Sequence, residues 1–396
     1  HSTASSTTPP TTPVTPMPMT IQSIRKSFLA LPVLAVLTLA TPVAAQQLPL
    51  TGDKSASCAK TPVEIYRQVA PSVVQVFSFG INPYKIAGRV ESKGGSGVFL
   101  GEDLVATNFH VVVDASAIAV GIGDTVFEAE LVGRDPVADI AILRANGLSA
   151  HIKPIALAPS NALDVGQPAH VIGYPLGIGK SISTGIVSGA GRVLPLHTSS
   201  WQSPFIQTDA PVSSGSSGGA LVDDCGHLIG LVTLRSGSTE AENISFAIPV
   251  ETLRRELPEL IESGKVARPW HGLYGQMVTP VILGLLGAPP MAALFARGFL
   301  VETVEPGSAA DKAGIRGGTL PVRWGMHEMI LGGDIIISVN GRRIQSLEDA
   351  RGVVRELVIG KTVTVQLLRD GIEMELSALI EERPVLERDL EAYRSR

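Results

Sequence analysis

Short apolar runs separated by turn residues dominate the middle of the chain. Between residues 61 and 250 each run is bounded by Gly, Pro, Asp or Asn. The clearest runs are Val73–Phe79, Gly97–Leu100, Ala117–Val120, Ala169–Ile172 and His227–Thr233. Glycine is frequent, at 41 residues, and aromatic residues make up only 5%. Because no long helical patterns intervene, this spacing predicts a mainly β domain over residues 61–255, built as a pair of barrels or a sandwich.

A region of different character follows this β-rich part. A helix is predicted at Val250–Glu262, and a linker is predicted over 256–267. Strands then alternate with helices near Ala309–Ala313 and Leu347–Leu357, which predicts a small α+β domain over 268–382. The strands predicted in this domain are Gly298–Val304, Asp334–Val339, Thr362–Arg369 and Glu373–Ile380.

Both ends of the chain are predicted to lie outside the two domains. Residues 1–45 combine a Ser/Thr/Pro-rich stretch with the pattern of a signal peptide: a basic pair, an apolar run and small residues ending at Ala45. The apolar run is short for a bilayer span, so we expect cleavage, with an uncleaved membrane anchor as the alternative. Residues 46–60 are predicted to be a linker. The tail, 383–396, is dense in charges of both signs and is expected to be a solvated helix or disordered.

Charge and cysteine content narrow the class of protein. The formal net charge of −5 gives no electrostatic reason to expect nucleic acid as a partner. Cys58 and Cys225 are too far apart for a Cys-x-x-Cys pair, and whether they form a disulfide in an oxidising compartment is open. No metal-ligand spacing is present, so neither a metal nor a cofactor is predicted. With the export signal, this indicates a periplasmic or secreted protein.

The most informative string runs from Thr208 to Val222 and centres on Ser217. A serine hydroxyl is a poor nucleophile unless a base removes its proton and backbone donors stabilise the oxyanion. Gly215 can adopt backbone angles closed to other residues, so the segment Gly215, Ser216 and Ser217 is predicted to form an oxyanion hole. Ser217 is favoured over Ser216 as the nucleophile because two glycines follow it directly.

Two further strings supply a base and an acid. His110 stands at the end of an apolar strand, and Asp139 directly precedes the apolar run Ile140–Leu143. The order His, Asp, Ser along the chain is the chymotrypsin order, which predicts His110, Asp139 and Ser217 as a catalytic triad. Asp135 is the alternative acid, but it does not abut the strand.

Two other motif matches are rejected on local context. Gly215-x-Ser217-x-Gly219 fits the nucleophile elbow of α/β-hydrolases, but a hairpin follows where that motif requires a helix. The stretch from Gly173 to Ser181 resembles a phosphate-binding loop with the wrong spacing, and we interpret it as a loop near the active site.

On these motifs the chain resembles the HtrA/Deg family of serine endoproteases, from about residue 61 to 382. The likeness includes the strings around His110, Asp139 and Ser217 and the segment Phe246–Pro249. The resemblance implies a chymotrypsin-like double β-barrel followed by a PDZ domain, assembly as a homotrimer or a multiple of it, and degradation of unfolded or damaged exported proteins. Two departures are Ser216, where the family usually has Asn, and Ala220, where it usually has Pro.

Substrate contacts are predicted in both domains. The primary specificity pocket is expected to be lined by Leu231, Thr233, Phe246 and Ala247; none is acidic, which favours cleavage after small or medium aliphatic residues. Trp270, His271, Gly272 and Leu273 resemble the carboxylate-binding loop of a PDZ domain, which implies binding of peptide C-termini. His271 stands where the family usually has an aliphatic residue.

Two functions of different class fit these features. The first is a serine endopeptidase that hydrolyses unfolded proteins through an acyl-enzyme. The second is a proteolytically inactive holdase or scaffold on the same fold, which Ser216 keeps open. A third expectation is a regulatory protease that cuts one signalling partner, with the PDZ domain as its sensor.

Overall fold

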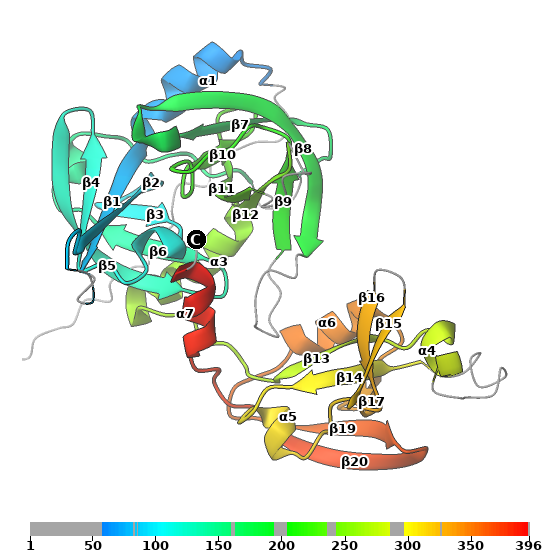
Figure 1. Cartoon of the computed structure of the whole chain (residues 1–396). Coiled ribbons are helices and arrows are strands. Elements are labelled where there is room, and N and C mark those ends of the chain that lie inside the picture. Colours follow the sequence, from blue (N-terminus) through cyan, green and yellow to red (C-terminus); the bar gives the residue numbers. More distant parts are fainter. Residues whose placement is uncertain are drawn as a thin grey trace, which may run out of the picture. The chain divides into compact units, whose positions relative to one another are not determined.

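The structure, a computed structural model, describes residues 58–81, 84, 86–159, 163–193, 204–235, 243–285, 297–324 and 327–394. The predicted signal peptide and most of the predicted linker over 46–60 lie outside the described residues. No helix in the described part of the chain is both long and apolar enough to cross a membrane. The fold is mainly β, with two closed barrels and a smaller C-terminal domain, as predicted (Figure 1).

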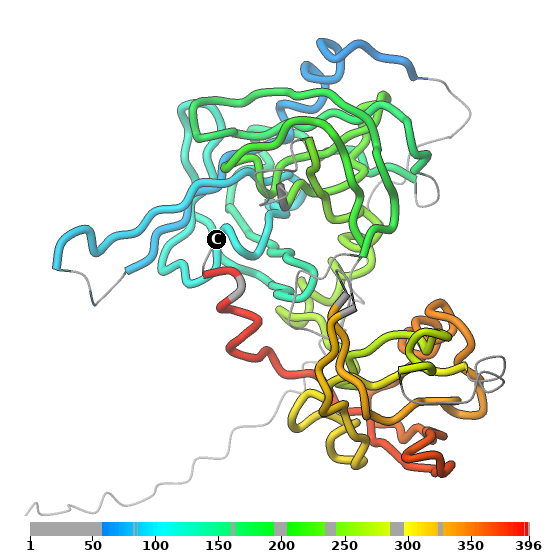
Figure 2. The backbone as a smooth tube through the Cα atoms, turned by 45° about the vertical axis from the view of Figure 1, so that its right-hand side comes forward, coloured from blue at the N-terminus to red at the C-terminus, as the bar shows by residue number. Residues whose placement is uncertain are grey.

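Six antiparallel strands close the first barrel in the spatial order β1-β2-β3-β6-β5-β4. They are β1 (Val73–Ile81), β2 (Val90–Gly101), β3 (Leu104–Thr107), β4 (Ala117–Ile122), β5 (Thr125–Asp135) and β6 (Ile140–Arg144). Val74 and Val76 of β1 alternate into the barrel and are fully buried, as the period of two predicts. The hairpin of β1 and β2 projects from the barrel (Figure 2) and carries exposed apolar side chains at Phe79 and Ile81.

The second barrel has the order β10-β11-β12-β9-β8-β7. Its strands are β7 (Pro168–Gly173), β8 (Ser181–Val193), β9 (Pro204–Thr208), β10 (Ala220–Val222), β11 (Leu228–Arg235) and β12 (Ser245–Pro249). Ile206, Leu221 and Leu228 fill its interior and have no exposed surface. The predicted catalytic residues lie on short segments between strands: His110 and Asp139 in the first barrel, and Ser217 in the second.

Helices, short 3₁₀ turns and one disulfide bond lie outside the strands of the two barrels. The helix α1 (Pro62–Val69) begins with a capping box of Thr61 and Glu64. The helix α3 (Val250–Ser263) ends at Gly264 in the left-handed conformation, close to the predicted bounds. Cys58 and Cys225 form a disulfide, which decides the pairing that the sequence leaves open. Short 3₁₀ turns are η1 (Ala70–Ser72), η2 (Leu148–Ala150) and η3 (Pro175–Gly177).

The C-terminal domain is built on one antiparallel sheet with the strand path β13-β14-β17-β19-β20 and β18 paired to β17. The strands are β13 (Leu273–Met277), β14 (Phe299–Val304), β17 (Ile335–Val339), β18 (Arg342–Arg343), β19 (Thr362–Arg369) and β20 (Ile372–Leu379). The helices α5 (Ala309–Lys312) and α6 (Leu347–Arg355) lie close to their predicted positions. The core of this domain centres on Val301, Ile336 and Leu367.

The stretch Thr319–Met329, which lengthens a loop of the C-terminal domain, largely forms a hairpin. Its strands are β15 (Leu320–Trp324) and β16 (His327–Leu331). Met329 and Leu331 pack with Leu300 of β14 and with Ile282 of α4 (Pro280–Leu285). The hairpin therefore covers apolar residues of the sheet. The sequence alone had not predicted this role for the stretch.

The charged tail forms the helix α7 (Glu387–Arg394). A helix was one of the two expectations for the tail, but complete solvation was wrong. Tyr393 has no exposed surface and Asp389 is only 7% exposed. Tyr393 packs with Phe109 and Val113 of the first barrel.

Candidate active site

His110 and Asp139 are in direct contact. His110 lies in α2 (Phe109–Val112), a single turn that follows β3, and Asp139 ends the turn before β6. The Nδ1 atom of His110 lies 2.8 Å from Oδ2 of Asp139, and the backbone N–H of His110 donates to Oδ1 at 2.9 Å. The two carboxylate oxygens thus hold the ring and the backbone of one residue, which fixes the direction of the imidazole.

The backbone of Asp139 is bound to the same turn. Its φ of 59° lies in the left-handed region, which residues other than glycine seldom adopt. Its carbonyl oxygen accepts hydrogen bonds from the N–H of Phe109 and from the side-chain amide of Asn108, both at 3.1 Å. These bonds hold the uncommon backbone conformation in place at the point where the two segments meet.

Thr233 is a further partner of Asp139. Its hydroxyl donates to Oδ2 of Asp139 at 2.5 Å. Burial alone would raise the pKa of Asp139, but the charge of His110 and the hydrogen bonds from His110 and Thr233 outweigh it and hold that pKa below its ordinary value. Asp139 is therefore ionised at neutral pH. The sequence pointed to Thr233 only as a pocket residue, because a hydroxyl on a strand gives no sign of a carboxylate partner far away in sequence.

Ser217 lies on the loop before β10. Its hydroxyl donates to the carbonyl oxygen of Thr233 at 3.2 Å, and among the described residues no hydrogen bond joins it to the ring of His110. Thr233 therefore has Asp139 on its hydroxyl and Ser217 on its carbonyl group. Hydrogen bonds of a catalytic serine are often long or misaligned without a substrate, so this arrangement is compatible with a triad.

The loop that contains Ser217 offers two backbone donors. Gly215 has φ 89°, and a Cβ atom there would lie 2.4 Å from the carbonyl oxygen of Tyr174, so only glycine fits. Within the described residues, the N–H groups of Gly215 and Ser217 have no acceptor. The N–H of Ser216 donates to the carbonyl oxygen of Ser213 at 2.9 Å, so it is not available as an oxyanion donor. That corrects one of the three predicted positions.

Ser96 connects the first barrel to this loop and was missed by sequence reasoning. It is fully buried on β2. Its N–H donates to the carbonyl oxygen of Ser217 at 2.8 Å, and its hydroxyl donates to the carbonyl oxygen of Gly215 at 2.7 Å. The hydroxyl also accepts the N–H of Tyr174 at 2.8 Å. The loop from Gly173 to Ser181 therefore starts beside the Ser217 loop, as the sequence interpretation expected.

Asp135, the alternative acid, has a different environment. Its carboxylate accepts the N–H groups of Val137 and Ala138 and bonds Arg268 at 2.5 Å. Arg268 also bonds Glu256 at 2.9 Å. Burial and the neighbouring charge of Asp135 raise the pKa of Glu256 to about 7, although Arg268 opposes this. Asp135 thus belongs to a buried ion-pair cluster away from the His110 ring.

The four predicted pocket residues fall into two groups: Leu231, Ala247 and Thr233 are buried, with the hydroxyl of Thr233 bonded to Asp139, and Phe246 keeps some exposed surface. Leu231 and Ala247 have no exposed surface and belong to the barrel core, so they offer no surface to a substrate side chain. Phe246 is only partly buried and stacks edge-on against Phe205 at 6.4 Å. The prediction went wrong for Leu231 and Ala247 because neighbouring residues of a strand point to opposite faces.

The predicted carboxylate-binding residues lie at the start of the C-terminal domain. Gly272 has φ 73°, and a Cβ atom there would lie 2.1 Å from the side chain of Ser308. The Nδ1 atom of His271 accepts the N–H of Leu273 at 3.2 Å. Burial lowers the pKa of His271 to about 4, so its ring is neutral at pH 7 and can accept this bond. One of the expected carboxylate donors is therefore already in contact with the His271 ring.

Glu305 is bonded to residues at both ends of this loop. It was not identified from the sequence. It is 2% exposed and accepts hydrogen bonds from the indole N–H of Trp270 and from the hydroxyl of Tyr274, the latter at 2.7 Å. Arg388 of α7 lies 2.6 Å from the same carboxylate, and Arg383 lies 3.7 Å away. Its two aromatic partners flank the loop, whereas its two arginines come from the tail.

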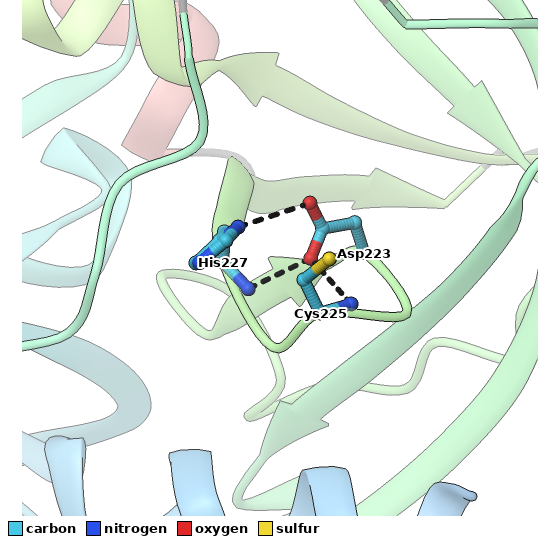
Figure 3. Close-up of side chains that lie close together, drawn as sticks. All are labelled: Asp223, Cys225 and His227. Carbon is cyan, nitrogen blue, oxygen red and sulfur yellow. Dashed lines mark hydrogen bonds and ion pairs between the residues drawn. The ribbon is translucent and has the colours of Figure 1, made fainter. Parts of the chain in front are cut away.

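Asp223, Cys225 and His227 have potential metal-ligating atoms close together (Figure 3). Cys225 is bonded to Cys58, so its sulfur is not a thiolate. Asp223 accepts the N–H groups of Cys225 and His227 at 3.0 and 2.8 Å, which closes the turn between β10 and β11. This donor set fits a turn and not a metal centre.

Comparison with protein families agrees with the two-part fold. The model of the Trypsin-like peptidase domain matches residues 95–231, and that of the PDZ domain matches residues 276–380. The chain is therefore a chymotrypsin-like serine endopeptidase that carries a PDZ domain.

Individual relatives narrow this class. The serine endoprotease DegS of Escherichia coli K12 is 32% identical over 92% of this chain and 99% of its own length. The periplasmic serine endoprotease DegP of the same strain is 36% identical over 72% of this chain and 56% of its own length. A solved structure of the HtrA-type protease AlgW with a decapeptide is 27% identical, with a TM-score of 0.65 over 82% of this chain and 99% of that chain. The chain belongs to the HtrA/Deg family of serine endoproteases.

Proposed function

We propose that this endoprotease is exported and cleaves unfolded or damaged proteins through an acyl-enzyme at Ser217. His110 takes the proton of the Ser217 hydroxyl and later returns a proton to the leaving amine. Asp139 orients the imidazole and stabilises its charged form. The observation that carries this proposal is the paired contact of Asp139 with the ring and backbone of His110, at 2.8 and 2.9 Å.

The N–H groups of Gly215 and Ser217 are the proposed oxyanion donors. Two features support this role: the left-handed backbone of Gly215 and the clamp that Ser96 places on the carbonyl groups of both residues. With both carbonyl oxygens held by Ser96, the adjoining peptide groups are kept in one orientation before a substrate binds.

The PDZ domain is proposed to bind peptide C-termini at the loop of Trp270, His271, Gly272 and Leu273. The HtrA-type protease AlgW has been solved with a decapeptide, which supports peptide binding in a protein of this kind. The contact of His271 with the Leu273 N–H means that the ring must turn aside, or that the carboxylate uses the remaining donors. A peptide-binding assay with free and amidated C-termini tests this, because only the free carboxylate should bind.

Export and assembly complete the proposal. The signal pattern before Ala45 and the periplasmic location in the name of DegP support a location outside the cytoplasm, in the periplasm for a Gram-negative source. A homotrimer or a multiple of it follows from the family resemblance. Sedimentation of the purified protein tests the assembly, and a monomer at working concentration would contradict it.

The proteolytic activity is tested with casein and a quenched peptide series. The wild type should degrade reduced, unfolded casein, and Ser217→Ala should not, while both proteins bind it. Residues before the cut should be small or medium aliphatic, because Phe246, the predicted pocket residue that keeps exposed surface, is apolar and carries no charge. A strong preference for Lys or Arg at that position would contradict the proposed pocket. If the wild type and Ser217→Ala both bind casein equally well and neither cleaves it, the result would favour the holdase alternative. Against that alternative, DegS and DegP are both named as endoproteases.

A further inference from the structure

The helix α7 lies beyond the matched PDZ domain, yet its last turn is buried against the first barrel. The family match ends at residue 380, and α7 spans Glu387–Arg394. Tyr393 has no exposed surface, as expected of a core residue and not of a charged tail. Figures 1 and 2 both draw this helix next to the first barrel, in agreement with the packing of Tyr393 on Phe109 and Val113. A buried tyrosine in such a segment needs an explanation.

Tyr393 contacts the turn that carries His110. Its ring meets the ring of Phe109 edge-on, with centroids 5.4 Å apart, and stacks at 12° against the imidazole of His110 at 6.4 Å. Phe109 is itself fully buried and has the guanidinium of Arg134 over its ring at 5.8 Å. Two rings of the short helix α2, those of Phe109 and His110, therefore face one aromatic ring from the far end of the chain.

Tyr393 also contacts the segment that carries Asp139. Its hydroxyl donates to the carbonyl oxygen of Pro136 at 2.6 Å, three residues before Asp139. The imidazole and the carboxylate belong to two different segments, and one side chain touches both. From this geometry we infer that Tyr393 is a positioning residue, which fixes the His110 turn against the Asp139 turn; the inference rests on the proposed catalytic roles of these two residues.

The helix that presents Tyr393 is anchored at both ends. Near its start, Arg388 bonds Glu305, and Asp389 pairs with Arg383 at 2.7 and 2.9 Å. At its end, Arg394 bonds Asp114 at 2.6 Å, just after α2. An eight-residue helix is unstable alone, so these contacts decide where Tyr393 stands. Loss of a catalytic geometry by about 1 Å costs on the order of a hundredfold in rate, so such a clamp matters for catalysis.

The test is a variant series in the full-length protein. Tyr393→Ala removes both contacts, and Tyr393→Phe keeps the ring contacts but loses the bond to Pro136. The matched control is Tyr84→Ala, since Tyr84 is 95% exposed between β1 and β2. Each protein is assayed for kcat and KM on a quenched peptide, for thermal unfolding, and for the downfield ¹H resonance of the His110 Nδ1–H bond to Asp139 in ¹⁵N-histidine-labelled protein.

We expect kcat to fall about tenfold in Tyr393→Ala and about threefold in Tyr393→Phe, with KM little changed and the His110 resonance shifted. The control should match the wild type. A folded Tyr393→Ala with wild-type kcat and resonance would overturn the inference. Should Tyr393→Ala fail to fold, Tyr393→Phe decides, and an unchanged kcat and resonance in it would overturn the inference equally.

The same assays separate this inference from the proposed function. If the wild type neither cleaves the peptide nor reacts with a fluorophosphonate, the proposed function fails. If the wild type is active and the Tyr393 series is flat, only the positioning role fails.

Discussion

Asp139 and Glu305 are both buried carboxylates that hold a functional loop, but their negative charges are compensated by different kinds of partner. Asp139 contacts a histidine and a threonine hydroxyl, and among the described residues it has no arginine or lysine partner. Glu305 has Arg388 at 2.6 Å and Arg383 at 3.7 Å. The charge of Asp139 is therefore left to stabilise a new positive charge on His110, whereas the charge of Glu305 is already balanced.

A substitution at Asp139 should reveal this difference most strongly, and in catalysis. In Asp139→Asn the amide cannot stabilise the imidazolium and favours the wrong tautomer, so kcat should fall by about ten-thousandfold while the fold remains. Peptide hydrolysis and circular dichroism measure the two effects. Activity within tenfold of the wild type would show that Asp139 is not the orienting acid.

The corresponding change at Glu305 should act on stability. Glu305→Gln removes the counter-charge of the partly exposed Arg388, leaves the buried Arg383 with Asp389 alone and weakens the hydrogen bonds from Trp270 and Tyr274, which together should cost about 3 kcal/mol of unfolding free energy. Urea unfolding measures the loss. The control is Glu356→Gln, which breaks the exposed pair with Arg342 and should cost no more than about 0.5 kcal/mol. Equal losses in the two variants would mean that the buried pairing has no special weight.

Glu256 is a third buried carboxylate, and its surroundings make the stability of the fold depend on pH. It shares Arg268 with Asp135, and Arg255 is its other cationic neighbour. Its pKa is raised from 4.5 to about 7, so the folded state binds this proton more tightly than the unfolded state does. Its contribution to stability is fully present below pH 4.5 and is lost as pH rises through 7.

Glu256→Gln should therefore remove a fall in stability between these pH values, worth about 3 kcal/mol in the wild type. Chemical unfolding at a series of pH values gives the slope directly. An identical slope in the variant would assign the pH dependence to other groups.

A weaker effect is expected at Thr233, which supports Asp139 through one hydrogen bond. Thr233→Val removes the hydroxyl that donates to Asp139 and keeps the side-chain shape, so kcat should fall about tenfold. Thr362→Val, on an exposed threonine at the start of β19, is the control and should leave kcat unchanged. A larger loss than in Asp139→Asn would show that Thr233, and not Asp139, has the greater weight in catalysis.

The sequence allowed prediction of those features whose signals are local. Strands were recognisable from apolar runs between turn residues, and His110, Asp139 and Ser217 from the short strings around each of them. Asp139 was preferred to Asp135 because it abuts β6, and the structure places it against His110. Helix α3 was recognisable for the same reason, since its start, face and terminal glycine lie within fifteen residues.

Features that depend on distant partners were not predictable. Glu305 contacts residues from Trp270 to Arg388, and no string contains both ends of that network. Tyr393 lies among charged residues, so the sequence pattern does not reveal that its ring is buried. The pocket residues Leu231 and Ala247 were misassigned because the strand register, not the residue type, decides which face points inward. The domain boundaries at 255, 267 and 382 remain predictions.

The catalytic role of Ser217 is tested most directly by labelling the folded wild-type protein with a fluorophosphonate, followed by mass spectrometry of the modified peptide. We predict a single adduct on Ser217, absent in Ser217→Ala and strongly reduced in Asp139→Asn. An adduct on Ser216, or no adduct on a folded protein that degrades casein, would contradict the assignment of Ser217, His110 and Asp139 as one catalytic unit.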